Sequence, residues 1–178
     1  LSWSPASSAA SHNVYFGDDF DSVNNGTGDT FRGNQVDLFY IVGFVGYPYP
    51  DGLVLGTTYY WRIDEVEADG TTIHKGDVWS FTVPPKTAYN PNPADGAEFV
   101  DLGAELSWTP GFGAVFHTVY FGDDFDTVNA ATGGTQQAAT TYNPGPLQSE
   151  KVYYWRVDES DALVTYKGDV WGFTTPGA

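Results

Sequence analysis

The sequence predicts an all-β protein built from two tandem antiparallel β-sandwich domains. Three observations support this prediction. Four sequence blocks occur twice in the same order, and the blocks alternate apolar and polar residues with the period of a β-strand. Clusters of Gly, Pro, Asn and Asp separate the blocks, as turns separate the short strands of a sandwich.

The repeated blocks define the domain organisation. They are LSWSP at 1–5 and LSWTP at 106–110, VYFGDDFDSVN at 14–24 and VYFGDDFDTVN at 119–129, YYWRIDE at 59–65 and YYWRVDE at 153–159, and KGDVWSFT at 75–82 and KGDVWGFT at 167–174. We therefore predict one domain at 1–84 and a second at 88–178, joined by a short linker that contains Pro84 and Pro85.

The block at 59–65 shows the alternation of a half-buried strand. Tyr59, Trp61 and Ile63 alternate with Tyr60, Arg62 and Asp64. If Trp61 faces the core, the polar set is expected to face solvent. No stretch of the chain has the periodicity of a helix, so we predict strands and turns throughout.

Charge and composition exclude several classes of function. The 178 residues include 23 acidic and 7 basic side chains, which gives a formal net charge of -16. This balance excludes nucleic acid as a partner, because phosphate binding needs clustered Lys and Arg. No apolar run approaches the roughly 18 residues of a membrane span, so we predict no membrane insertion. The absence of cysteine excludes thiolate metal sites, and the absence of methionine indicates a processed protein or part of a longer one.

Aromatic residues at matched positions carry a resemblance to a known family. Trp3 and Trp108 occupy the same repeat position, and a Leu precedes a Tyr by six residues at Leu53–Tyr59 and at Leu147–Tyr153. With these features the chain resembles tandem fibronectin type III-like modules, especially those of bacterial secreted or cell-surface multidomain proteins and polysaccharide-degrading enzymes. The resemblance implies a tyrosine corner in each domain and an extracellular or cell-surface location.

The first domain departs from that pattern in two ways. Residues 90–105 precede LSW in the second domain and can supply a first strand, whereas the first domain begins at LSW. We therefore expect its first strand to lie outside this sequence or to come from another segment or chain. The first domain also carries an insertion at about 29–52, which has no close counterpart in the second.

The insertion is too apolar for an ordinary solvated loop. It predicts an interface at Phe39, Tyr40, Ile41, Val42, Phe44 and Val45, because exposed apolar patches usually mark contact surfaces. The alternatives are an internal extension of the core, which is the favoured interpretation, and a ligand pocket.

Aromatic and basic residues beside the repeated strands form a second candidate site. Flat aromatic rings next to polar groups suit sugar rings, which predicts ligand-binding roles for Tyr15, Tyr60, Arg62, Tyr120, Tyr154 and Arg156, followed by Tyr47 and Tyr49. The favoured alternative is a structural ladder in which tyrosine packs along the arginine stem and arginine pairs with acids.

Two acidic clusters are candidate calcium ligands. They are Asp18, Asp19 and Asp21 in the first copy, and Asp123, Asp124 and Asp126 in the second. The favoured alternative is a turn in which Asp accepts hydrogen bonds from the backbone. No other cofactor is expected.

No catalytic motif is present, so we predict that the protein is not an enzyme. His12 and His117 share one repeat position and are expected to be partly buried strand residues, and no metalloprotease, nucleophile-elbow or phosphate-loop pattern occurs.

The leading hypothesis is a non-catalytic structural or assembly module of a larger secreted or surface protein, in which cell adhesion is one expected role. Its partners would be neighbouring domains or copies of itself, and strand complementation at the open edge could propagate into a filament. The alternative is a pair of carbohydrate-binding modules attached to a polysaccharide-degrading enzyme, and a weaker alternative is a passive spacer.

Overall fold

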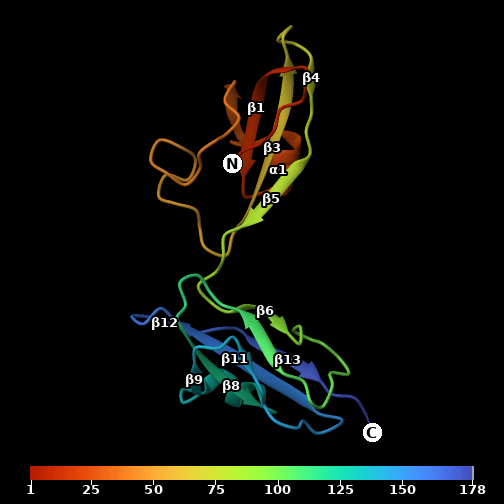
Figure 1. Cartoon of the computed structure of the whole chain (residues 1–178), viewed down its shortest axis with the longest axis vertical. Coiled ribbons are helices and arrows are strands. Elements are labelled where there is room, and N and C mark those ends of the chain that lie inside the picture. Colours follow the sequence, from red (N-terminus) through yellow and green to blue (C-terminus); the bar gives the residue numbers. More distant parts are fainter. Residues whose placement is uncertain (178) are drawn as a thin grey trace. The chain divides into compact units, whose positions relative to one another are not determined.

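The structure, a computed structural model, describes residues 1–177 and contains two compact units (Figure 1). Unit one is Leu1–Val83 and unit two is Pro84–Ala178. Antiparallel strands dominate both units, with two short helices. The predicted all-β fold class is confirmed.

Unit one is built around one antiparallel sheet. Its strands have the order β2-β1-β3-β4, and β5 pairs with the other part of β3. The register places Val14 opposite Ile63 and Trp61 opposite Trp79, so their side chains share the core face. The elements are β1 (Ala9–Gly17), α1 (Phe20–Asn25), β2 (Phe31–Gln35), β3 (Thr58–Glu67), β4 (Ile73–His74) and β5 (Val78–Thr82).

Unit two contains two sheets that enclose a core. One sheet has the order β10-β7-β6, and the other has the order β12-β11-β8-β9 with β13 paired to β11. Both sheets contribute to the core, because Leu106 and Trp108 of β7 pack with Val119, Trp155 and other residues of the larger sheet. The elements are β6 (Tyr89–Asn92), β7 (Leu106–Thr109), β8 (Phe116–Gly122), α2 (Phe125–Ala130), β9 (Thr135–Gln137), β10 (Thr141–Tyr142), β11 (Val152–Ser160), β12 (Thr165–Tyr166) and β13 (Val170–Thr174).

The two helices contradict the prediction of strands and turns throughout. Each has six residues and begins after an aspartate, Asp19 or Asp124, whose side chain accepts a hydrogen bond from a backbone N–H three residues later. Helix α1 ends at Gly26, which has the left-handed backbone conformation that favours glycine. Helices this short cover less than two turns, which is too little for a periodic pattern.

Both units form the tyrosine corner that the resemblance implies. The backbone N–H of Val54 donates to the Tyr59 hydroxyl over 3.0 Å, and the N–H of Gln148 donates to the Tyr153 hydroxyl over the same distance. The repeated Leu and Tyr spacing therefore corresponds to the same loop closure in both units.

We expect Asp69 to titrate at an unusually low pH. Its carboxylate accepts the backbone N–H groups of Thr71 and Thr72 and the Thr72 hydroxyl, and these bonds lower the pKa of Asp69 to about 2. A lowered pKa means that the bonds stabilise the turn above the ordinary pKa of 3.8 and are lost as the pH falls through about 2.

An NMR pH titration of the Asp69 carboxyl carbon measures this directly. Thr72→Ala removes the strongest donor and is expected to raise the midpoint. A midpoint near 3.8 in the unmodified chain would contradict the turn geometry.

Candidate functional site

The two arginines predicted to bind ligand are buried. Arg62 is 3% exposed and Arg156 is 1% exposed. Arg156 donates from Nε and Nη2 to the two carboxylate oxygens of Asp158 over 2.8 and 3.0 Å, and it also donates to the carbonyls of Val128, Asn129 and Ala131. Those carbonyls lie at the end of α2, where a positive charge satisfies groups that the helix leaves unpaired.

Arg62 occupies the matching position in unit one. It donates to the carbonyls of Val23 and Asn24 at the end of α1 and pairs with Asp64. The expectation that Arg62 and Asp64 face solvent is therefore wrong, because α1 covers that face of the sheet (Figure 1). The alternation of residues along β3 shows that the strand has two different faces, and in this structure both faces are buried.

The tyrosines of this group pack as the ladder interpretation predicts. The Arg62 guanidinium lies 4.1 Å from the centre of the Tyr15 ring, and Arg156 lies at the same distance from Tyr120. Tyr60 and Tyr154 are half-buried and meet the edges of Phe20 and Phe125. Both copies thus use these residues to attach a helix to the sheet.

The acidic clusters also have a local structural role. Hydrogen bonds from Ser22 lower the pKa of Asp19, and those from Thr127 lower the pKa of Asp124. Their neighbours Asp18, Asp21, Asp123 and Asp126 are exposed. Within residues 1–177 no three acidic or histidine side chains are arranged to hold a metal ion.

Each unit contains a histidine–glutamate pair that sequence reasoning missed. His12 Nδ1 lies 2.5 Å from Glu65 Oε2, with the edge of Trp3 against the imidazole. His117 and Glu159 form the same pair in unit two, where burial raises the pKa of Glu159 and His117 opposes that rise. Asp64 and Glu65 therefore point to opposite faces of β3, as neighbours on a strand must.

The insertion supplies one of the missing pairings in unit one. The backbone N–H of Trp3 donates to the Leu38 carbonyl over 3.2 Å, and the backbone N–H of Trp108 donates to the Thr140 carbonyl in unit two. The Gln35 side chain donates to the carbonyls of Asp37 and Phe39, and Gln137 makes the matching pair of bonds. The start of the insertion therefore does have a counterpart in the second copy, at β10.

In unit one, the segment that contains Trp3 pairs with the insertion on one side, and its other side has no neighbouring strand among the described residues. In unit two, β7 also pairs with β6, and residues 95–100 run beside β13. Unit one has no described segment in either place, since β5 pairs with β3 alone. Whether a first strand exists outside this sequence stays a prediction.

Core positions next to this gap are more exposed in unit one than their counterparts are in unit two. Trp79 is 44% exposed, whereas Trp171, its counterpart in unit two, is 7% exposed. The same contrast, half-buried in unit one against buried in unit two, holds for four more pairs: Leu1 and Leu106, Trp3 and Trp108, Trp61 and Trp155, and Phe81 and Phe173. We call Leu1, Trp3, Trp61, Trp79 and Phe81 the open face of unit one.

The residues predicted as an interface in the insertion divide into two groups. Tyr40, Ile41 and Val42 are half-buried, which supports the core-extension interpretation for this part. Phe39 is exposed in its pairing with Ser2, and Phe44 and Val45 are 66% and 88% exposed in the loop that leaves the sheet (Figure 1).

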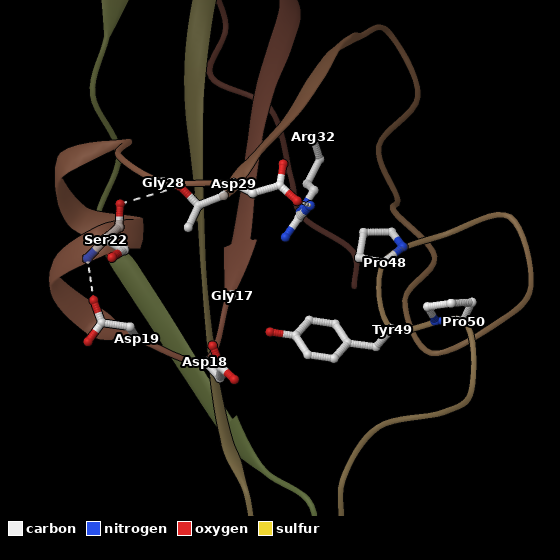
Figure 2. A pocket seen from close by; sticks show the side chains of 11 residues that line it. Gly17, Asp18, Asp19, Ser22, Gly28, Asp29, Arg32, Pro48, Tyr49 and Pro50 are labelled. Atoms are coloured by element: carbon white, nitrogen blue, oxygen red, sulfur yellow. Dashed lines mark hydrogen bonds and ion pairs between the residues drawn. The ribbon is translucent and has the colours of Figure 1, made fainter.

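The same insertion encloses a cleft of about 620 Å³ (Figure 2). Pro48, Tyr49 and Pro50 line one side, and Asp18, Asp19, Ser22, Asp29 and Arg32 are among the residues on the other. Figure 2 shows the Tyr49 hydroxyl pointing toward Asp18. Burial first, and then the nearby Asp18 carboxylate, raise the pKa of Tyr49 to about 12.

Tyr49 is held in the cleft by aromatic packing. Its ring meets Tyr59 at a centroid distance of 4.9 Å and Phe16 at 5.6 Å, both edge-on. Arg32 donates to the Phe16 carbonyl through Nε and Nη2. The structure therefore places Tyr49 apart from Tyr60 and Arg62, with which sequence reasoning had grouped it; Tyr47 is exposed on the loop.

Comparison with known proteins finds similarity to solved structures only. No protein-family model matches the chain, and no curated protein matches it. Among solved structures, the chain is similar to the FN1–FN3 domains of chicken CNTN1, with a TM-score of 0.38 and 11% sequence identity. The match covers 98% of this chain and 61% of that one. No helix among the described residues is long and apolar enough to cross a membrane.

Proposed function

We propose that this chain is a non-catalytic structural module of a larger extracellular protein, which assembles through the open face of unit one. The single observation that carries the proposal is the contrast between Trp79 and Trp171. Two copies of one domain place the same tryptophan in the same strand, yet one is largely covered and the other is not. An apolar face next to an unpaired strand edge is a template for β-augmentation.

The native mass of the 178-residue protein tests the proposal. Light scattering across a range of concentrations, with electron microscopy, is expected to show oligomers or filaments that grow with concentration. Trp79→Ser is expected to reduce them, because it removes the most exposed large side chain of the open face. The matched control is Leu163→Ser, which removes an apolar side chain that is 93% exposed in unit two.

Two outcomes would contradict assembly through unit one. One is a monomer of 19.4 kDa at every concentration. The other is an equal loss of assembly in the Trp79 and Leu163 variants, which would place the contact elsewhere or make it unspecific. The light-scattering measurement is repeated with and without millimolar calcium. This comparison separates assembly that needs screening of the acidic surface from assembly through a specific contact.

Carbohydrate binding is a second candidate, and the cleft beside Tyr49 favours it. The cleft combines an aromatic ring with carboxylates, a hydroxyl and a guanidinium, which can bond to sugar hydroxyls. A glycan array tests it, with Tyr49→Ala as the variant and Tyr154→Ala as the matched control in unit two. Absence of binding to any neutral glycan would contradict this candidate.

A further inference from the structure

We propose that the cleft beside Tyr49 selects a sugar unit that carries a free amino group, over the same unit with a hydroxyl or an acetamido group in that place. This inference rests on the carbohydrate-binding candidate and names its class of ligand. It starts from the charges and the hydrogen-bonding groups of the residues that line the cleft.

The cleft is built by features that unit two lacks. The register of β1 and β2 shifts between Val14 and Tyr15, which leaves Arg32 as an extra residue in β2. A bulge of this kind redirects a side chain, and Arg32 here bonds to the Phe16 carbonyl. In unit two, β8 and β9 pair without such a shift, and the comparable hollow of about 260 Å³ is lined by no charged residue.

The one basic residue of the lining, Arg32, is largely engaged within the protein. Its Nε and Nη2 donate to the Phe16 carbonyl over 3.1 and 2.8 Å. Its Nη1 lies 3.5 Å from a carboxylate oxygen of Asp29. The Arg32 side chain is 14% exposed, so it presents little more than the Nη1 edge to a ligand.

The carboxylates of the cleft are less engaged. Asp19 begins α1 by accepting the N–H of Ser22 over 2.8 Å. Asp18 is exposed and forms no ion pair within residues 1–177, and Figure 2 shows the Tyr49 hydroxyl pointing toward it. The Asp29 side chain is fully exposed beside its long contact with Arg32. Since a carboxylate can accept about four hydrogen bonds, Asp18 and Asp29 can both bind further donors.

The balance of charge favours a cationic group in the cleft. The lining contains three carboxylates and one guanidinium. Residues 1–83 as a whole contain eleven acidic and three basic side chains. An ammonium group has three donors and no acceptor, and its hydrogen bonds to a carboxylate are stronger than those of a neutral hydroxyl. An ammonium beside Asp18 is therefore favoured by hydrogen bonding and by the field of the unit.

The rest of the lining suits a sugar ring better than a lysine side chain. Pro48, Tyr49 and Pro50 form an uncharged wall, while Ser22 and the Nη1 edge of Arg32 supply polar groups. A sugar ring carries hydroxyls around its amine and can bond to these groups with its C–H face against the wall. A lysine stem has no hydroxyl and would leave them unpaired, which weakens binding.

Three oligosaccharides with one β-1,4-linked backbone test the proposal on the intact 178-residue protein. They are the tetramers of glucosamine, N-acetylglucosamine and glucose, which differ only in the group on the second ring carbon. Calorimetric titration at low salt, below the pKa of the amine, is expected to show one glucosamine tetramer per chain. We expect it to bind at least about tenfold more tightly than the other two, and this advantage should shrink as salt is added.

Asp18→Asn is the test variant, and Asp123→Asn is the matched control. Asp123 has the same place in the repeated block and is also exposed. Asp18→Asn is expected to remove the advantage of the amine and to leave binding of the glucose tetramer unchanged. Asp123→Asn is expected to change neither, which separates the cleft from a general attraction between a polycation and an acidic protein.

Three results would overturn the proposal. They are equal affinity for the three oligosaccharides, equal effects of Asp18→Asn and Asp123→Asn, and equally tight binding of a lysine tetrapeptide, which would show that the cleft accepts any amine. If neutral glycans bind and the glucosamine tetramer has no advantage, only this inference fails. If neither a neutral glycan nor the glucosamine tetramer binds, the carbohydrate-binding candidate fails with it.

Discussion

Asp158→Ala is expected to lower the free energy of unfolding of unit two by about 3–5 kcal/mol. The carboxylate holds Arg156 through two hydrogen bonds and also accepts the N–H of Gly168 over 3.0 Å. Its removal leaves a buried guanidinium without its counter-ion. The penalty arises because a charge that is 1% exposed cannot recover its hydration while α2 stays in place.

Urea unfolding of the full chain, followed by hydrogen exchange of peptides from each unit, measures this loss. Protection should fall in unit two and remain in unit one. Asp169→Ala is the matched control, because Asp169 is an exposed acid next to the same Gly168 and its loss should change stability by less than about 0.5 kcal/mol. A loss below about 1 kcal/mol for Asp158→Ala would contradict a structural role for this pair.

The repeat allows the same experiment in the other unit. Asp64 pairs with Arg62 and accepts the N–H of Gly76 over 3.1 Å. In the Asp64→Ala variant, hydrogen-exchange protection should therefore fall in unit one and remain in unit two. The two glycines are part of this arrangement, since a Cβ on Gly76 or Gly168 would lie 2.1 Å from the carbonyl of Ile63 or Val157.

These contacts explain three of the four repeated blocks. VYFGDDFD contains the aspartate that begins the helix. YYWRxDE contains both the arginine that binds the end of the helix and the aspartate that pairs with this arginine, and KGDVW contains the glycine whose N–H donates to this second aspartate. The repeat predicted the strands, because the alternation of a strand is local, and the family resemblance implied the tyrosine corners. The repeat could not show that the three blocks meet around one buried ion pair, which depends on tertiary packing.

The helices were missed although local signals were present. Asp19 stands where an N-cap residue is favoured, and Gly26 stands where a helix commonly ends. A search for periodicity overlooks a helix of only six residues. Because this helix covers one face of the central strand β3, the strand is then wrongly judged to be half-exposed. The error in the placement of Arg62 follows directly from the missed helix.

The open face of unit one was not among the predicted site residues. The alignment of the two copies showed only that residues 90–105 have no counterpart within the given first copy and that this copy carries an apolar insertion. The degree to which Trp79 is exposed could not be predicted, because Trp79 and Trp171 lie in nearly identical sequences. Residues 95–100 run beside β13 in unit two, and β5 has no such neighbour among the described residues of unit one.

This difference leads to a contrast between two identical substitutions. Trp171→Ala is expected to destabilise unit two by about 3–5 kcal/mol, because the ring is buried against Trp155 at a centroid distance of 4.7 Å. Trp79→Ala is expected to destabilise unit one by only about 1–2 kcal/mol. Trp79 also packs on a tryptophan, Trp61, at 4.6 Å, but nearly half of its surface already contacts solvent.

Hydrogen exchange of each unit, measured across a urea series, gives both values in the full chain. Equal losses would show that Trp79 is covered in solution, and the open face would then not be open.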